Sequence, residues 1–201
     1  MLGNTNVRRY WGQLTNPIAK IFIKLGISSD FVTVFGTFGV VTVSVLTFPQ
    51  GKFFIGSIFI GIFVLFDSID GAIARLSGRN SKWGAFLDSV MDRIADGAFI
   101  GSIAIYYLNQ DQLQFVILTL VALVASEIVS YTKARAESLG FKCDTGFGER
   151  AERIIITIFG TSFAGFGFPI VLDISIWVLA LVALFTVWQR ISFVYKQAPK
   201  Y

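Results

Sequence analysis

Residues 53–74 read FFIGSIFIGIFVLFDSIDGAIA, and this stretch decides the fold class. Its first part, residues 53–66, holds no charged side chain. The stretch is long enough for a helix to cross the hydrocarbon layer of a bilayer, which takes about 20 apolar residues. The chain as a whole has the same character, with 201 residues, 54% of them hydrophobic, and a mean hydropathy of +0.68. Because such blocks leave no polar face for a soluble helix, the sequence predicts an integral membrane protein.

Five further apolar stretches have a similar length, and turn-forming residues such as Pro49 and Gly51 separate them. They cover residues 31–49, 84–108, 112–134, 152–169 and 171–194. Small residues within them permit close helix packing. We therefore expect an all-α domain of six transmembrane helices over residues 27–201.

The segment before these stretches, residues 1–26, has a different pattern. Its apolar side chains recur near helical spacing, and its basic side chains occupy the other positions. The apolar set is Tyr10, Trp11, Leu14, Ile18, Ile21, Phe22 and Leu25, and the basic set is Arg8, Arg9, Lys20 and Lys24. This pattern is typical of an amphipathic helix that lies on a membrane surface. We expect a cytoplasmic juxtamembrane helix here.

The 17 Lys and Arg residues divide unevenly between the two ends of the predicted spans. Only Lys52 falls on one side. The others precede the first span, lie in or near the second-to-third and fourth-to-fifth connections, or lie at the end of the chain. The positive-inside rule then places both termini and both basic connections in the cytoplasm of a multi-pass cell-membrane protein. The net charge of +4 faces anionic lipid and gives no reason to expect a nucleic-acid partner.

The histidine and cysteine counts exclude some kinds of catalytic group and cross-link. The chain has no histidine, which excludes imidazole as a base, nucleophile or metal ligand. Its single cysteine, Cys143, cannot form an internal disulfide.

Two pairs of acidic residues adjoin the second and third spans, where acidic side chains are rare and usually functional. The pairs are Asp67 with Asp70 and Asp88 with Asp92, and each pair shares one helix face because its members are three or four residues apart. A short polar loop joins the two spans, so we expect the pairs to face each other at the cytoplasmic surface. Divalent cations would relieve their repulsion, and oxygen ligands alone favour Mg²⁺ or Mn²⁺ over zinc. Two metals held in this way commonly bind phosphate oxygens.

The neighbouring residues fit a phosphate ester. Gly71, Ala74 and Gly84 leave room for a ligand at the backbone, and Arg75 offers a forked donor for phosphate oxygens. The alternative is that these charges form a helix-end ion pair and solvated loop residues. Two facing pairs with interleaved glycines favour the functional interpretation.

The motif Asp67-Ser-Ile-Asp70-Gly-Ala-Ile-Ala-Arg75, eight residues, then Gly84-Ala-Phe-Leu-Asp88-Ser-Val-Met-Asp92 resembles the signature of the CDP-alcohol phosphotransferase (CDP-alcohol phosphatidyltransferase) family. Every fixed position is filled. The resemblance implies a six-helix membrane homodimer with a cytoplasm-facing active site. It also implies transfer of a substituted phosphate from a CDP-linked lipid to an alcohol, with release of CMP.

The resemblance also implies a role for each motif residue. Asp67, Asp70 and Asp88 would be the chief ligands of two Mg²⁺ or Mn²⁺ ions, and Asp92 would bind the second ion and act as general base. CDP-diacylglycerol would be bound by Asp30, Thr33, Gly71, Ala74, Arg75, Ser81 and Gly84. Many relatives have Pro-Asn where this chain has Ser29-Asp30.

Basic residues at three helix ends indicate the kind of alcohol that accepts the phosphatidyl group. We expect Lys133, Arg153 and Arg190 to converge beside the acidic site, which would suit a phosphorylated polyol, although positive-inside anchoring is the alternative. The segments 133–137 and 149–153 resemble actinobacterial phosphatidylinositol phosphate synthases. That resemblance implies that Ser130, Lys133, Arg153 and Arg190 bind inositol phosphate. The predicted acceptor is 1D-myo-inositol 3-phosphate, and glycerol 3-phosphate remains the alternative because charge alone does not separate the two.

A function of a different class, cation transport, also accounts for acidic residues in a multi-span protein. The acidic residues gather at one membrane edge, however, and no series of carboxylates continues to the other face. Asp96 extends the Asp88–Asp92 series by one turn as a supporting residue or a helix contact, and Glu127 has no assignable role.

Overall fold

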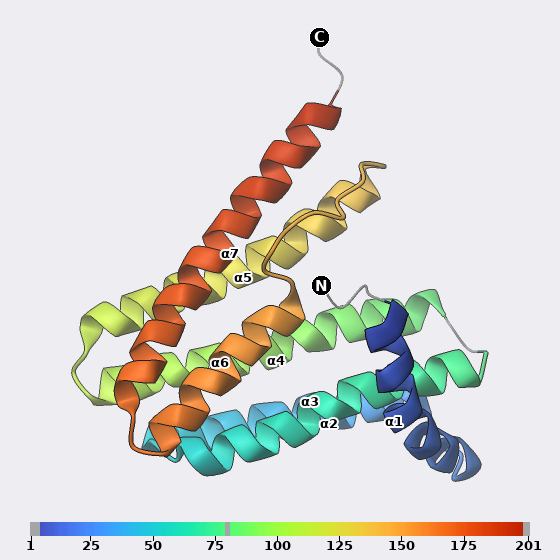
Figure 1. The fold of residues 1–201 in the computed structure, drawn as a ribbon, viewed down its shortest axis with the longest axis horizontal. Coiled ribbons are helices and arrows are strands. Elements are labelled where there is room, and N and C mark those ends of the chain that lie inside the picture. Colours follow the sequence, from blue (N-terminus) through green and yellow to red (C-terminus); the bar gives the residue numbers. More distant parts are fainter. Residues whose placement is uncertain (1–4, 79–80, 199–201) are drawn as a thin grey trace. The chain divides into compact units, whose positions relative to one another are not determined.

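The computed structural model describes residues 5–78 and 81–198, with side chains from Thr15 onward (Figure 1). Within these ranges the chain is helical, and the predicted all-α class is confirmed. The α-helices are α1 (Thr5–Lys24), α2 (Ser29–Thr47), α3 (Phe53–Leu76), α4 (Lys82–Asn109), α5 (Leu113–Ser138), α6 (Arg150–Gly165) and α7 (Pro169–Gln197), and a short 3₁₀ turn, η1 (Phe48–Gln50), follows α2.

The helix boundaries differ from the predicted ones mainly around the fourth and fifth spans. The fourth span was predicted to end at residue 134, but α5 continues to Ser138 and ends before Gly140, which has a left-handed φ of 82°. The fifth was predicted over residues 152–169, but α6 has only 16 residues and ends at Gly165. The charged run predicted between these two spans extends α5 at its end and α6 at its start. At its other end, α6 stops at Gly165, before Gly167 with its left-handed φ of 95°.

The chain forms two compact units, which are described separately. The first comprises residues 1–43 and 59–95, and the second comprises residues 44–58 and 96–201. In the first unit, α1 packs on α2 and α3 through Ala19, Val32 and Ala72, which are almost fully buried. Close approach of α2 to α3 depends on Gly39, because a Cβ atom there would lie 2.2 Å from the ring of Phe63.

In the second unit, α7 packs along both α5 and α6 (Figure 1). Leu179 and Ala180 of α7 are buried against Ala122 of α5 and Ile100 of α4. Gly160 lets α6 approach α7, since a Cβ atom there would lie 2.6 Å from the Cβ of Ser175. This packing fixes the positions of the basic side chains that α5, α6 and α7 carry.

Four helical segments in the described ranges are long and apolar enough to cross a membrane: Ser29–Gln50, Phe53–Leu76, Leu113–Ser138 and Pro169–Gln197. Large apolar side chains are exposed on them, for example Phe38, Val124 and Trp188. Exposure of this kind over whole helices fits a lipid environment and not water. The protein is therefore a membrane protein.

The count of six spans stays a prediction, because α4 and α6 are not among these four segments. Charged residues occupy the first half of α4, and α6 is short. The helix α1 lies within the predicted 1–26 segment, but its amphipathic location on a membrane surface and the domain boundary at residue 26 also stay predictions. The side chains of residues 5–14 lie outside those described.

Candidate active site

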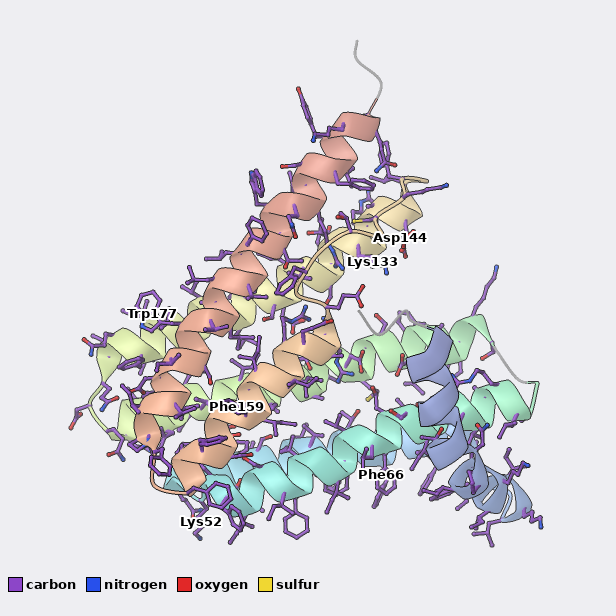
Figure 2. All side chains as sticks on the ribbon, viewed as in Figure 1. Lys52, Phe66, Lys133, Asp144, Phe159 and Trp177 are labelled. Atoms are coloured by element: carbon purple, nitrogen blue, oxygen red, sulfur yellow. The ribbon has the colours of Figure 1, made fainter. Side chains whose placement is uncertain are left out.

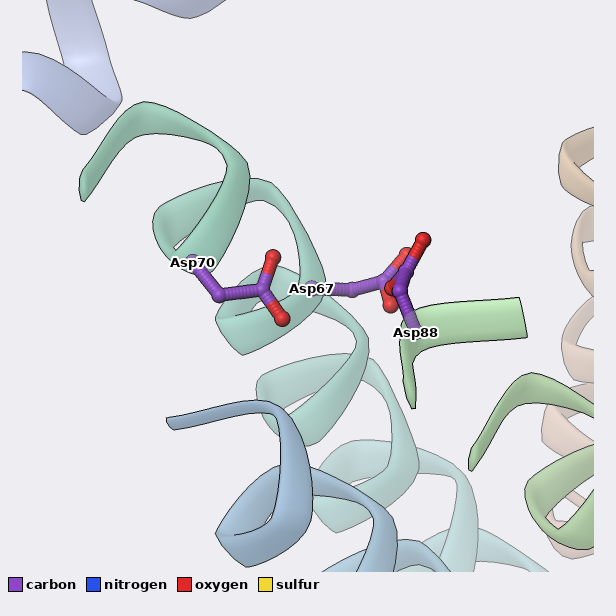
Figure 3. Close-up of side chains that lie close together, drawn as sticks. All are labelled: Asp67, Asp70 and Asp88. Carbon is purple, nitrogen blue, oxygen red and sulfur yellow. The ribbon is translucent and has the colours of Figure 1, made fainter. Parts of the chain in front are cut away.

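Three aspartates of the first unit form an acidic cluster (Figure 3). Asp67 and Asp70 lie one turn apart on α3, and Asp88 belongs to α4. One carboxylate oxygen from each residue lies within 4.8 Å of the other two. Asp70 is buried, whereas Asp67 is exposed and Asp88 is half-buried. The facing arrangement expected from the motif spacing is therefore present for these three residues.

The chemistry of the cluster fits a divalent cation. Two ionised carboxylates at this separation repel each other by about 3 kcal/mol at an effective dielectric constant of about 20. Thr33 of α2 donates a short hydrogen bond from its hydroxyl to Oδ2 of Asp70. This bond holds the buried carboxylate in place but does not neutralise its charge. A ligand set of carboxylate oxygens alone matches Mg²⁺ or Mn²⁺.

A cavity of about 290 Å³ opens beside the cluster, lined by residues of α2, α3 and α4 and by the α3–α4 connection. Its lining includes Asp67, Asp70 and Asp88 together with Ser29 and Ala85. All the residues for which the family resemblance implied contacts with CDP-diacylglycerol also line it, namely Asp30, Thr33, Gly71, Ala74, Arg75, Ser81 and Gly84. The structure thus gathers around one cavity residues that are up to 59 positions apart, from Ser29 to Asp88.

The two motif glycines lie where added side chains would meet polar groups of the cavity. A Cβ atom on Gly71 would lie 3.2 Å from Nη1 of Arg75. A Cβ atom on Gly84 would lie 3.2 Å from Oγ of Ser81 and 3.7 Å from Oδ1 of Asp30. The backbone N–H of Gly84 also donates to Oγ of Ser81 at 2.9 Å. Both glycines therefore keep the cavity wall open beside these side chains.

Sequence reasoning missed Trp83, which joins α4 to α2. Its indole Nε1 donates to Oδ2 of Asp30 at 3.1 Å, although the ring itself is exposed. The available signal was its position directly before Gly84 in the motif. The bond fixes the direction of the Asp30 carboxylate at the edge of the cavity.

Asp92 is not one of the three clustered carboxylates, and it is not among the cavity-lining residues described above. Nη2 of Arg93 lies 3.9 Å from its Oδ2. Its predicted roles as a metal ligand and general base stay predictions.

Two deeply buried arginines of the second unit lie against α5. Arg153 of α6 donates from Nη1 to the carbonyl of Gly148 at 2.7 Å and from Nη2 to Oγ of Ser130 at 3.4 Å. Arg190 of α7 donates from Nη1 to the carbonyl of Val129 at 2.6 Å. The structure thus brings Ser130, Arg153 and Arg190 together around one turn of α5.

The charge of Arg190 is balanced differently from that of Lys133. Nζ of Lys133 lies 3.9 Å from carboxylate oxygens of both Glu137 and Asp144. Figure 2 shows Lys133 and Asp144 near the end of α5. Arg190 binds backbone carbonyls, including that of Thr145 at 2.9 Å, and within the described part of the chain it forms no ion pair with a carboxylate. These carbonyls accept its hydrogen bonds without neutralising its charge. Placement of these basic residues beside the acidic cluster stays a prediction.

The comparisons with known proteins agree with the acidic motif. Residues 27–188 match the sequence profile of the CDP-alcohol phosphatidyltransferase family. The phosphatidylinositol phosphate synthase of Streptomyces avermitilis is 40% identical over 205 residues, which span 98% of this chain and 84% of that protein. The protein of the same name from Mycobacterium tuberculosis is 40% identical over 192 residues, which span 94% of this chain and 88% of that protein.

Solved structures of the Mycobacterium tuberculosis phosphatidylinositol phosphate synthase have the same fold. The structure with bound CDP-DAG matches with a TM-score of 0.86 at 39% identity, over 91% of this chain and 94% of that one. The complex with manganese and citrate matches with a TM-score of 0.85 at 40% identity, over 90% of this chain and 88% of that one. With its filled acidic motif and the cavity beside it, this chain is an enzyme that belongs to the CDP-alcohol phosphatidyltransferase family.

Proposed function

We propose that this enzyme transfers the phosphatidyl group of CDP-diacylglycerol to 1D-myo-inositol 3-phosphate, giving phosphatidylinositol phosphate and CMP. The observation that carries the reaction class is the cluster of three carboxylates at the cavity lined by the glycines and Arg75 of the motif. The acceptor rests on the buried arginines beside Ser130 and on the relatives named phosphatidylinositol phosphate synthase.

The donor lipid occupies the cavity of the first unit in this proposal. Gly71 and Gly84 admit its diphosphate close to the backbone, and Arg75 pairs with phosphate oxygens. Asp67, Asp70, Asp88 and Asp92 hold two Mg²⁺ ions, or Mn²⁺ as in the manganese complex of the relative. When bound, the ions neutralise the diphosphate oxygens during displacement at phosphorus. Thr33 keeps the Asp70 carboxylate oriented for this purpose.

Transfer requires one bond to form and one to break. A hydroxyl oxygen of the acceptor attacks the phosphorus that bears diacylglycerol, and the bond from that phosphorus to the CMP oxygen breaks. Asp92 takes the hydroxyl proton, and CMP leaves with the electron pair of the broken bond. Such a displacement depends on positioning and on charge neutralisation, so the chain needs no covalent nucleophile.

The acceptor is recognised through its phosphate group by Ser130, Lys133, Arg153 and Arg190. A guanidinium group donates two parallel hydrogen bonds to phosphate oxygens, and these are stronger than bonds to neutral carbonyls. Arg190 is 4% exposed, so its guanidinium group holds little water that a bound phosphate would have to displace. The contact between the two would be a strong, charge-assisted hydrogen bond. Free inositol carries no charge that would balance these groups.

We further propose that the enzyme is a homodimer in the cell membrane. It has six transmembrane helices and a surface α1 helix, and its termini and active site face the cytoplasm. The single basic residue Lys52 on the opposite side supports this orientation. The homodimer rests on the family resemblance. Membership of an enzyme family removes the support for cation transport, whereas phosphatidylglycerophosphate synthesis remains the second candidate because its acceptor also carries a phosphate.

Release of CMP from purified protein tests this function. The protein is supplied with CDP-diacylglycerol, Mg²⁺ and one of three acceptors: inositol 3-phosphate, glycerol 3-phosphate or free inositol. We expect CMP only with inositol 3-phosphate, and we expect Asp92→Asn to abolish it while CDP-diacylglycerol binding persists. Release only with glycerol 3-phosphate would contradict the acceptor, and normal turnover by Asp92→Asn would contradict the base assignment.

A further inference from the structure

A buried carboxylate of the second unit has no role in the reaction described above. Asp96 of α4 is 6% exposed and lies between two arginines of α6. Its Oδ1 accepts a hydrogen bond from Nε of Arg150 at 3.2 Å. Its Oδ2 lies 3.9 Å from Nη2 of Arg153. One carboxylate thus serves two guanidinium groups, one of which is the proposed phosphate ligand.

Arg150 and Arg153 lie at the start of α6, where their positive charges do not stabilise the helix itself. Arg150 and Arg153 occupy its first and fourth positions, so they share a face. Positive charges in the first turn of a helix oppose its macrodipole and destabilise it slightly. Glu152 supplies one negative charge in this first turn, and Asp96, which belongs to a different helix, supplies another.

The guanidinium group of Arg153 is held from three directions. Gly148, in the connection before α6, accepts from Nη1 at 2.7 Å. Ser130 of α5 lies 3.4 Å from Nη2, and Asp96 of α4 faces the same nitrogen. At 3.9 Å the carboxylate is too distant for a hydrogen bond, but in a buried setting its charge still orients the group. Asp96 therefore fixes the direction of Nη2.

Asp96 is shared between the two arginines of α6. Its Oδ1 faces Arg150, and its Oδ2 faces Arg153. Arg190 contacts the same turn of α5 through the carbonyl of Val129. The shorter bond to Arg150 anchors Asp96, so that its second oxygen stays directed at Arg153.

We propose that Asp96 is a positioning residue for the phosphorylated acceptor. Its carboxylate is fixed by Arg150 and holds the Arg153 guanidinium in the direction that binds the acceptor phosphate. This inference rests on the proposed function, because it assumes that Arg153 binds that phosphate. It assigns Asp96 a role in acceptor affinity and none in binding of the donor lipid.

Steady-state kinetics of the full-length protein test the proposal, with each substrate varied in turn. Asp96→Asn removes the charge but keeps the shape, and we expect it to raise KM for inositol 3-phosphate about tenfold. KM for CDP-diacylglycerol should stay within about twofold, and Asp96→Glu should recover most of the acceptor affinity. Asp173→Asn is the matched control, because Asp173 also accepts a partly buried hydrogen bond, from Tyr107 at 2.7 Å, but does not contact Arg150 or Arg153.

Two further variants separate failure of this proposal from failure of the proposed function. If Arg153→Gln leaves KM for inositol 3-phosphate unchanged, the proposed function fails with it. If Arg153→Gln raises that KM but Asp96→Asn does not, the positioning role alone is overturned. An equal rise in both KM values for Asp96→Asn would also overturn it, because a general loss of structure would act in that way.

A double variant and a milder variant complete the test. Asp96→Asn combined with Arg153→Gln should have the acceptor KM of Arg153→Gln alone, since the carboxylate acts through that arginine, and additive effects would overturn the proposal. If Asp96→Asn does not fold, Arg150→Gln removes the anchor at a side chain that is 22% exposed. It should raise the acceptor KM about threefold, and an unchanged value would overturn the proposal.

Discussion

At the scale of single residues, the acidic cluster shows how one buried carboxylate differs from its more exposed neighbours. Asp70 is 6% exposed and accepts a hydrogen bond from Thr33, whereas Asp67 is exposed and Asp88 is half-buried. A buried carboxylate that lies close to two others depends most on a bound cation for its ionised state. Loss of Asp70 should therefore weaken metal binding without a large structural change.

The first prediction concerns metal affinity. Asp70→Asn should lower the affinity of the purified protein for Mn²⁺ at least tenfold, because it removes a ligand charge and keeps the volume. The measurement is the electron paramagnetic resonance signal of free Mn²⁺ in a titration, which does not depend on turnover. Asp144→Asn is the control, since Asp144 is an exposed carboxylate of the second unit. Equal affinities for the Asp70→Asn and unsubstituted proteins would contradict Asp70 as a ligand.

At the scale of helices, the motif and the apolar runs predicted much of what the structure contains, for identifiable reasons. The apolar stretches located the helices because burial in lipid demands long runs without charge. The spacing of Asp67, Asp70 and Asp88 placed them on facing surfaces because the α3–α4 connection is short. The apolar stretches and the spacing of the aspartates are local properties of the chain, so they can be recognised in the sequence alone.

One difference is local, and the others arose where distant residues determine the structure. The apolar pattern ended the fourth span at residue 134, but Lys133 and Glu137 lie one turn apart and are compatible with continued helix. Asp30 and Trp83 are 53 positions apart, and Asp96 and Arg150 are 54 apart. Such pairs exist only because the helices pack, and one sequence gives no periodic signal for them.

The second prediction belongs to the packing of helices in the second unit. A Cβ atom on Gly165 of α6 would lie 2.3 Å from the backbone nitrogen of Phe54 in α3. Backbone cannot move aside as a flexible side chain does, so Gly165→Ala should destabilise the fold by about 1–3 kcal/mol. The melting temperature in detergent should fall by several degrees. Gly101→Ala is the matched control, because nothing lies within 4 Å of its added carbon, and it should melt no lower than the unsubstituted protein.

At the scale of the whole molecule, the exposed apolar side chains indicate a surrounding bilayer, whereas the basic residues indicate the orientation of the protein in it. Apolar exposure along α2, α3, α5 and α7 requires a bilayer around these helices. It does not say which end of each helix faces the cytoplasm. The basic residues supply that direction, because Lys52 is the only one assigned to the outer side and α5 is followed by a connection that carries several.

The last prediction tests that direction with single cysteines in a Cys143→Ser background. Lys52, Gln110 and Lys142 are all exposed and lie in connections or at their edges, so each position accepts a cysteine with little cost to packing. In intact cells, a membrane-impermeant maleimide should label Lys52→Cys and Gln110→Cys. It should label Lys142→Cys only after the membrane is opened. The Cys143→Ser protein alone gives the background signal.

Labelling of Lys142→Cys in intact cells, with Lys52→Cys protected, would reverse the orientation and place the basic connection after α5 outside. The charge asymmetry would then need another cause, because positive residues on the outer side oppose the rule that sets topology during insertion. Labelling of Lys52→Cys and Gln110→Cys on opposite sides would instead exclude the six-span arrangement, since the helices α3 and α4 between them would then cross the membrane an odd number of times.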